Sequence, residues 1–115
     1  MHPETRDPAY LWDMLDAATS IREFTRNATF HEYAGNKLLR SAVERQLEIL
    51  GEAAKRISAG FKESHPEIPW RQIVGLRNML AHEYGDIKDN RVWQIVTESV
   101  PALIAQLEPL LPPRT

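Results

Sequence analysis

The stretch KLLRSAVERQLEILGEAAKRIS, residues 37–58, decides the fold class of this chain. Its apolar residues recur at intervals of three and four, the period of one face of an α-helix: Leu39, Val43, Leu47, Leu50, Ala54 and Ile57. The carboxylates Glu44, Glu48 and Glu52 lie on the outer face of the same helix. The pattern predicts a long amphipathic helix over residues 37–58 that buries one side against neighbouring helices.

Helical spacing continues on both sides of this stretch, and no segment alternates in the way of a half-buried strand. Before it, Asp7 followed by Pro8 predicts the N-cap and first turn of a helix over residues 8–26. After it, the glycine and prolines of residues 60–69 predict a connector. Within the connector, residues 64–67 resemble a capping box, and their proline leaves a simple turn as the alternative.

Two further helices complete the expected fold. The third runs from residue 69 to about residues 82–85, where a Gly-Asp pair is a stop signal, and the last runs over residues 90–110 with Asp89 as its N-cap. Pro101 lies inside the last helix and is expected to kink or split it. We therefore predict an all-α fold, an up-and-down bundle of four to five helices.

Length and composition restrict the setting of this bundle. The chain has 115 residues, no Cys and a formal charge of −2, which predicts one domain over residues 1–115 without disulfides or sulfur-bound zinc. Residues 1–6 and 112–115 are expected to be flexible tails. No apolar run reaches the roughly 18 residues of a membrane span. We expect a cytoplasmic protein without membrane contact, in which any phosphate ligand is held by a local patch of charge.

Side chains that can bind phosphate or transfer a proton are concentrated in the segment RNMLAHEY, residues 77–84, called the 77–84 motif below. Arg77 offers a planar fork of donors for phosphate oxygens, and His82 titrates near neutral pH. With Arg77 stabilising charge, His82 acting as general acid or base and Asn78 orienting the imidazole or the ligand, these residues suit metal-independent RNA cleavage to a 2′,3′-cyclic phosphate. Each residue also has an ordinary alternative role at a helix end.

Helical geometry separates these side chains. At about 100° per residue, Asn78 and His82 share one face, Arg77 and Tyr84 share another, and Arg77 lies about 140° from His82. Arg77 and His82 could meet if the helix frays, if Arg77 reaches round it, or if a second copy of the chain completes the site. The third option predicts a functional homodimer.

The chain resembles the HepT-like branch of the HEPN family along nearly its whole length. The resemblance rests on the 77–84 motif and on blocks in the same order: Leu15-Asp16-Ala17-Ala18, Ile21-Arg22-Glu23-Phe24, residues 42–56, His65-Pro66-Glu67-Ile68-Pro69-Trp70 and Val92-Trp93-Gln94-Ile95-Val96-Thr97. It implies a small helical bundle that forms homodimers with a cleft at the interface, and a toxin that cleaves RNA. The family's catalytic roles fall on Arg77 and His82, and Asn78 fits the polar position beside the Arg.

The resemblance also gives Tyr84 a role. In HepT-like systems a minimal nucleotidyltransferase (MNT) antitoxin transfers AMP from ATP to the motif tyrosine, so Tyr84 is the expected acceptor. A nucleotide with negative charge beside Arg77 and His82 would fill the cleft and repel RNA. The chain itself is then expected to need no cofactor and no metal, because the ATP is used by the antitoxin.

The motif pattern occurs a second time, in RNATFHEY at residues 26–33, called the 26–33 copy below. The residues that flank the copy differ from those that flank the 77–84 motif, which follows the helix start at Pro69-Trp70. We therefore interpret the copy as a coincidence. His31 serves as the natural control for His82.

Other residues support the site or leave alternatives open. Glu48 and Glu52 are placed on the second helix where they could orient Arg77. The basic residues of that helix either follow an RNA backbone or form a solvated face with neighbouring glutamates: Lys37, Arg40, Arg45, Lys55 and Arg56. Trp12, Trp70 and Trp93 either pack inside the bundle or lie at a subunit interface.

Two classes of function follow from the sequence. The first is a toxin ribonuclease neutralised by an MNT partner. The second is a non-catalytic HEPN subunit that binds nucleotide or serves as a docking surface for the transferase. The sequence leaves open which RNA, tRNA or mRNA, would be cut.

Overall fold

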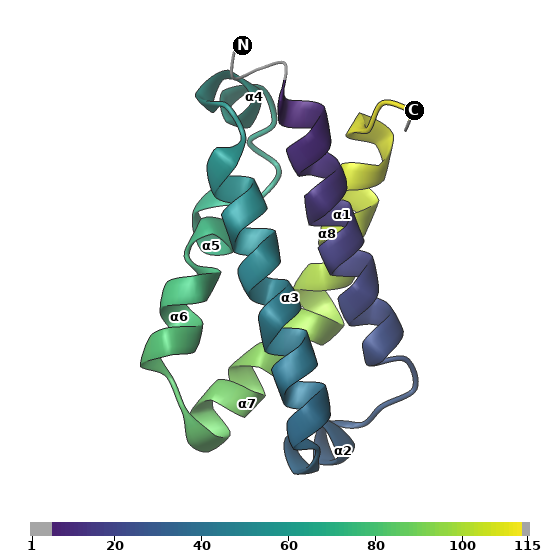
Figure 1. Cartoon of the computed structure of the whole chain (residues 1–115), viewed down its shortest axis with the longest axis vertical. Coiled ribbons are helices and arrows are strands. Elements are labelled where there is room, and N and C mark those ends of the chain that lie inside the picture. The colour runs from purple at the N-terminus through teal and green to yellow at the C-terminus, as the bar shows by residue number, and fades with distance from the viewer. Residues whose placement is uncertain (1–5, 114–115) are drawn as a thin grey trace.

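The computed structural model describes residues 6–113, and within that range the chain is helical with no strand (Figure 1). The all-α prediction is confirmed. The elements, in chain order, are α1 (Asp7–Phe24), α2 (Phe30–Gly35), α3 (Lys37–Arg56), α4 (Ala59–Ser64), α5 (Trp70–Val74), α6 (Leu76–His82), α7 (Gly85–Gln94), the π-helix η2 (Ile95–Ser99), α8 (Val100–Leu107) and the 3₁₀ turn η3 (Glu108–Leu110).

The two long helices α1 and α3 pack side by side and form the centre of the bundle (Figure 1). Helix α8 packs against α1, whereas α5 and α6 pack against α3. The apolar stripe predicted for residues 37–58 faces this core: Val43, Leu47, Leu50, Ala54 and Ile57 are buried, and Leu39 is partly buried. At Gly51 a Cβ atom would lie 3.0 Å from the Ile73 carbonyl oxygen, so α3 and α5 approach backbone to backbone.

The first helix begins differently from the prediction. Arg6, not Asp7, occupies the N-cap, and Asp7 is the first helical residue. The buried Asp7 carboxylate accepts hydrogen bonds from the Ser58 backbone N–H (2.9 Å) and hydroxyl (2.6 Å). Asp7 therefore joins the start of α1 to the junction between α3 and α4, a contact between residues far apart in the chain.

The short helices differ most from the prediction. Helix α2 lies between the first two predicted helices, where no element was predicted, and α4 overlaps the segment predicted as a connector. The third predicted helix is divided at Gly75 into α5 and α6. Helix α7 begins at Gly85, so Asp89 is not an N-cap. The capping box predicted at residues 64–67 is also wrong. Ser64 bonds back to the Gly60 carbonyl, in agreement with the alternative of a turn, and a complete capping box instead opens α2.

The predicted break at Pro101 is present as a change of helix type. Residues Ile95–Ser99 form a π-helix, and Pro101 lies in the first turn of α8. Proline donates no backbone hydrogen bond and its ring clashes with the carbonyl four residues earlier, so a wider turn before it relieves the clash.

The tryptophans have intramolecular partners but are not fully buried. The Trp70 indole donates to the His65 carbonyl (2.9 Å), and Trp93 packs on Tyr33 with ring centroids 5.4 Å apart. Trp12 is partly buried against the core. Of the predicted tails, residues 1–5 and 114–115 lie outside the described residues.

No helix in the described part of the chain is both long and apolar enough to cross a membrane.

Candidate functional site

Helix α6 presents the 77–84 motif at the edge of the bundle. Leu76 and Leu80 are buried against the core, which turns the opposite side of the helix outward. Arg77, Asn78 and His82 are therefore exposed. The two buried leucines, four residues apart, thus fix the rotation of α6 about its axis, and the polar residues of the helix face solvent as a result.

Arg77 and Asn78 line one hollow, of about 300 Å³, between α6 and α3. Glu52 and Lys55 of α3 line the same hollow. Arg77 Nη1 lies 3.5 Å from Glu52 Oε1, which is the contact expected from Glu52. Glu48 is half-buried, and the structure gives Glu52, not Glu48, as the acidic partner of Arg77 among the described residues.

The His82 ring makes a hydrogen bond to the backbone of its own helix. Its Nδ1 lies 2.8 Å from the Asn78 backbone carbonyl oxygen, one turn earlier in α6. A carbonyl oxygen only accepts hydrogen bonds, so Nδ1 carries the proton and the Nε2 lone pair of the neutral ring is free to accept one. The backbone of Asn78, rather than its side chain, thus orients the imidazole.

A single chain does not bring the whole motif together. The hollow that contains Arg77 and Asn78 does not include His82. Both Arg77 and His82 lie on the same short helix and are exposed, with Arg77 on the side that faces α3. The hollow beside α3 thus holds Arg77 and Asn78 and leaves His82 outside it.

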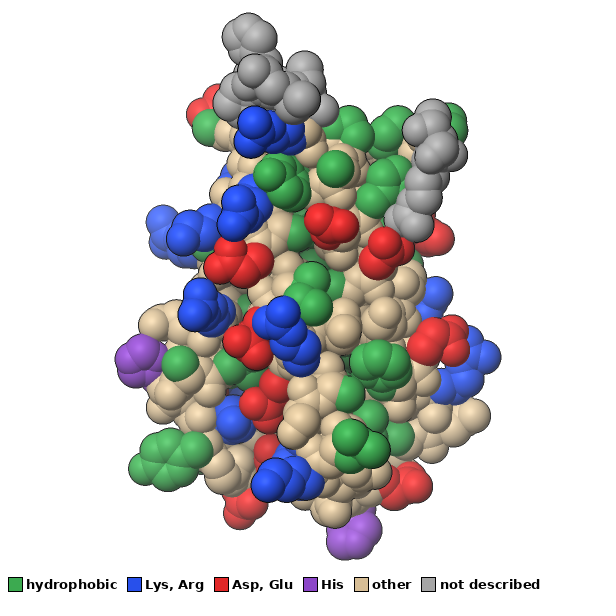
Figure 2. All heavy atoms as spheres, viewed as in Figure 1, with side chains coloured by type: hydrophobic (Ala, Val, Ile, Leu, Met, Phe, Trp, Pro, Cys, Tyr) green, Lys and Arg blue, Asp and Glu red, His purple; other side chains and the backbone are tan. Residues whose placement is uncertain are grey.

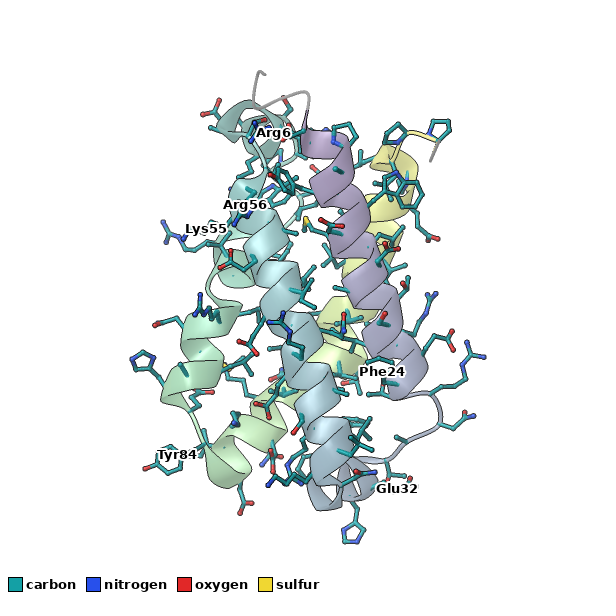
Figure 3. The ribbon with its side chains drawn as sticks, in the orientation of Figure 1. Arg6, Phe24, Glu32, Lys55, Arg56 and Tyr84 are labelled. Atoms are coloured by element: carbon teal, nitrogen blue, oxygen red, sulfur yellow. The ribbon has the colours of Figure 1, made fainter. Side chains whose placement is uncertain are left out.

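Tyr84 lies outside the helix, contrary to the prediction that it shares a helical face with Arg77. Helix α6 ends at His82, and Glu83 and Tyr84 are extended. The next residue, Gly85, has φ +64°, a conformation that glycine adopts without strain and that starts α7. Tyr84 is 82% exposed and projects away from the body at this corner (Figure 3). The exposed side chain can be reached by another protein.

An ion pair that the sequence analysis missed fixes this corner. Glu83, between His82 and Tyr84, pairs through Oε1 with Arg91 Nη1 of α7. The second carboxylate oxygen, Oε2, is buried and has no hydrogen-bond partner within the described residues. The pair ties the end of α6 to α7 across the extended residues. Opposite charges eight residues apart, on either side of a helix end, form no periodic pattern that would mark them as a pair in the sequence.

The 26–33 copy has a different structure. Arg26 is paired with Glu23 (2.5 Å) in the turn after α1, and Asn27 has φ +62°. His31 is exposed on α2, but Tyr33 is completely buried. Burial, followed by the nearby charges of Glu44 and Asp89, raises the pKa of the Tyr33 phenol. The copy therefore lacks an accessible tyrosine.

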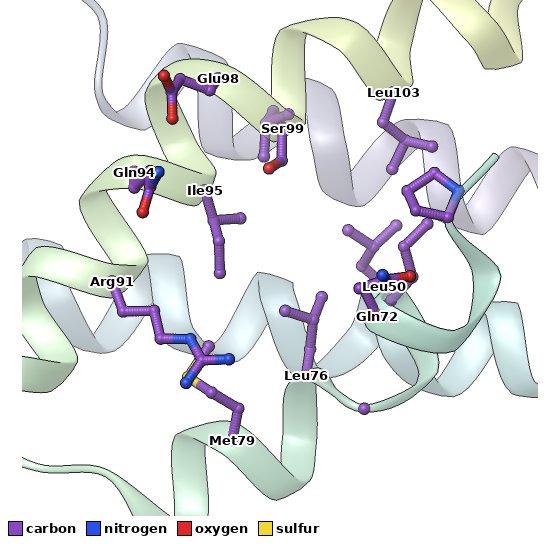
Figure 4. A pocket seen from close by; sticks show the side chains of 14 residues that line it. Leu50, Gln72, Leu76, Met79, Arg91, Gln94, Ile95, Glu98, Ser99 and Leu103 are labelled. Carbon is purple, nitrogen blue, oxygen red and sulfur yellow. The ribbon is translucent and has the colours of Figure 1, made fainter. Parts of the chain in front are cut away.

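A groove larger than the hollow between α3 and α6 lies on another side of α6 (Figure 4). It measures about 440 Å³ and is bounded by α5 and α6 on one side and by α7, η2 and α8 on the other. Its lining is mainly apolar, from residues such as Leu50, Leu76, Met79, Ile95 and Leu103. Among residues 6–113, no cluster of three or more His, Asp or Glu side chains is arranged to hold a metal ion.

Comparisons with known proteins identify the family of the chain. The family described as "Ribonuclease HepT-like" matches residues 14–110. The chain is 43% identical over 100 residues to "Putative RNase MJ1380" of Methanocaldococcus jannaschii, covering 87% of this chain and 92% of the relative. It is 42% identical over 101 residues to "Probable ribonuclease HepT" of Thermococcus cleftensis, covering 88% and 92% respectively. No solved structure gives a significant match. The chain belongs to the HepT-like ribonuclease family.

Proposed function

We propose that this protein is a ribonuclease that cleaves RNA without a metal ion and acts as the toxin of a toxin–antitoxin pair. The family and the names of the relatives support the ribonuclease function. The observation that carries the proposal is the 2.8 Å contact between His82 Nδ1 and the Asn78 carbonyl oxygen, because a hydrogen bond donated by Nδ1 leaves Nε2 as the base.

The chemistry follows from the exposed side chains of α6. His82 Nε2 accepts the proton of a ribose 2′-hydroxyl, and the 2′-oxygen attacks the adjacent phosphorus. The bond from phosphorus to the 5′-oxygen breaks, giving a 2′,3′-cyclic phosphate and, after protonation, a 5′-hydroxyl. Arg77 donates to the phosphate oxygens as negative charge develops, and Asn78 in the same hollow offers an amide donor.

The proposal includes a homodimer, because Arg77 and His82 of one chain do not share a hollow. A second copy placed beside α6 would supply the missing half of the site. The apolar groove along α6 offers that copy a surface to bury.

Regulation is proposed to act at Tyr84. Its phenol oxygen attacks the α-phosphate of ATP bound to a cognate MNT nucleotidyltransferase, pyrophosphate leaves, and AMP remains on the tyrosine. The 82% exposure of Tyr84 supports access by such an enzyme. The added phosphate and base, two residues from His82, compete with RNA for the site.

The test is incubation of the purified protein with total RNA, with and without a chelator, followed by analysis of the new 3′ ends. We expect cleavage that resists the chelator and leaves cyclic phosphate ends. Cleavage that stops in chelator and returns with added metal would contradict the metal-independent mechanism.

A second candidate is a non-catalytic HEPN subunit that binds nucleotide or docks the transferase. It is favoured by the separation of Arg77 and His82 together with the projecting Tyr84. Modification of Tyr84 without cleavage of any RNA by the unmodified protein would support this candidate over the ribonuclease.

A further inference from the structure

Lys55 is an exposed cation at the edge of the hollow that contains Arg77. It lies in the last turn of α3 beside Arg56 (Figure 3), and it lines the hollow together with Glu52, Arg77 and Asn78. Lys and Arg side chains gather over this part of the surface (Figure 2). Within the described residues, the Lys55 ammonium has no carboxylate partner, whereas its neighbours do.

Glu52 is shared between two arginines. Its Oε1 lies 3.5 Å from Arg77 Nη1 and its Oε2 lies 4.0 Å from Arg56 Nη2. Both contacts are long, and the Arg77 and Glu52 side chains are 71% and 42% exposed, so the pairing is weak. With Lys55 included, this end of α3 and the start of α6 place three cations around one carboxylate.

The charge of one carboxylate does not balance three cations, and a bound phosphodiester would balance it better. The surplus positive charge attracts an anion, and the Arg77 guanidinium can bind two phosphate oxygens at once. The Asn78 amide adds a neutral donor in the same hollow. A phosphate that replaces Glu52 as the partner of Arg77 would come within the reach of Lys55, whose flexible stem carries a compact charge.

We propose that the hollow between α3 and α6 is the binding site for the RNA backbone, with Lys55 as a phosphate-binding residue beside Arg77. The inference rests on the proposed function, which supplies the RNA, and it adds a subsite and a residue to it. Glu52 pairs weakly with Arg77 in the free protein and gives way when the phosphate binds. Lys55 contributes to affinity and takes no part in proton transfer.

A contact with phosphate has two measurable consequences. It strengthens binding irrespective of base sequence, and it adds to the dependence of affinity on salt, by a slope of about 0.7 per neutralised phosphate on a single strand. The loss of Lys55 should therefore raise KM for RNA cleavage several-fold and leave kcat unchanged. The loss of a catalytic residue would lower kcat.

The experiment measures binding of a fluorescent single-stranded 2′-O-methyl RNA, which cannot be cleaved because it lacks the nucleophilic hydroxyl. Lys55→Ala is compared with Lys55→Arg and with the matched control Arg22→Ala, which removes an exposed cation from α1. Thermal unfolding checks that all variants fold. We expect Lys55→Ala to weaken binding several-fold and flatten the salt dependence, Lys55→Arg to keep both, and Arg22→Ala to match the wild type.

The outcomes separate this inference from the proposed function. Equal affinity and salt slope in Lys55→Ala and wild type would overturn the inference, even if the wild type cleaves RNA. Equal losses in Lys55→Ala and Arg22→Ala would also overturn it, because they indicate a general charge effect. Binding that depends on Lys55 in a protein that cleaves no RNA would support the site and contradict the ribonuclease.

Discussion

The pattern Arg-Asn-x3-His-Glu-Tyr occurs in the 26–33 copy and again in the 77–84 motif, and the two segments differ most at their last residue. Tyr33 is completely buried under Trp93, whereas Tyr84 is 82% exposed at the corner between α6 and α7. In the first segment the helix α2 begins inside the pattern and carries the tyrosine into the core. In the second, α6 ends inside the pattern and releases the tyrosine to solvent.

The glutamates show the same contrast. Glu32 closes a capping box with Thr29, and the hydrogen bonds from the Thr29 backbone and side chain lower the pKa of its carboxyl. Glu83 instead pairs with Arg91 of the next helix. Identical residues therefore stabilise a local helix start in one place and a contact between helices in the other. The comparison teaches that the position of the helix end, more than the residue pattern, determines which copy can be a site.

The largest expected difference between the two segments is in modification. Co-expression with a cognate MNT transferase should add AMP to Tyr84 and none to Tyr33, because Tyr84 is exposed and Tyr33 is completely buried. Peptide mass mapping measures this directly. Tyr84→Phe should abolish the addition and Tyr33→Phe should retain it, and AMP found on another residue of Tyr84→Phe would contradict the assignment.

The two arginines should differ strongly in activity. Arg77→Ala should lower the rate of RNA cleavage by about 10²- to 10³-fold, as expected for removal of a donor to developing charge. Arg26→Ala should leave the rate unchanged, because Arg26 pairs with Glu23 in a turn. Initial rates on a labelled RNA, with circular dichroism to confirm folding, provide the comparison. Equal losses in both variants would remove the distinction between the segments.

A smaller effect is expected from the pair that holds the corner. Glu83→Gln and Arg91→Gln should each destabilise the α6–α7 junction, and a double-mutant cycle should give a coupling free energy of about 0.5–3 kcal/mol. Each variant should also slow AMP transfer to Tyr84, because the extended residues lose their anchor. Additive free energies of unfolding, with no coupling, would show that the pair does not position the corner.

The smallest effect concerns the buried phenol. The Tyr33 hydroxyl has no hydrogen-bond partner within the described residues, so Tyr33→Phe should change the free energy of unfolding by no more than about 1 kcal/mol. The raised pKa of the Tyr33 phenol predicts the direction in which the stability changes with pH. Above the ordinary value of 10.0 the phenol ionises in the unfolded chain but stays neutral in the folded one, so the stability from Tyr33 falls as pH rises.

Denaturant unfolding at neutral pH and at about pH 11 tests this linkage. The wild type should lose more stability over that interval than Tyr33→Phe does. Tyr84→Phe is the matched control and should lose as much as the wild type. If Tyr33→Phe and wild type lose equal amounts, the phenol ionises as readily in the folded protein as in the unfolded one.

Much of the fold was predictable because the apolar faces of the long helices extend over several turns. The apolar spacing of residues 37–58 predicts α3 almost to its ends, and the proline at 101 predicts the interruption that the π-helix provides. Helices α2 and α4 have only six residues each, too short for a periodic pattern to stand out. The break at Gly75 was missed because the apolar seam runs through it.

The sequence predicts the candidate residues of the site but not their contacts. It gives Arg77, Asn78, His82 and Tyr84 as candidates and Glu48 or Glu52 as a partner of Arg77, and in the structure Glu52 lies 3.5 Å from Arg77. The tautomer of His82 depends on a backbone carbonyl, and no residue type signals it. The Glu83–Arg91 pair depends on the extended residues 83–84 and on the left-handed Gly85, which together set how α7 follows α6.

The central claim, that the 77–84 motif and not the 26–33 copy cleaves RNA, is tested most directly by the two histidines. Cleavage rates of His82→Ala and His31→Ala should be measured on the same RNA with equal amounts of folded protein. We predict that His82→Ala slows cleavage by about 10²- to 10⁴-fold, the contribution of a general acid or base, and that His31→Ala cleaves at the wild-type rate. Full activity in His82→Ala with loss of activity in His31→Ala would contradict the account.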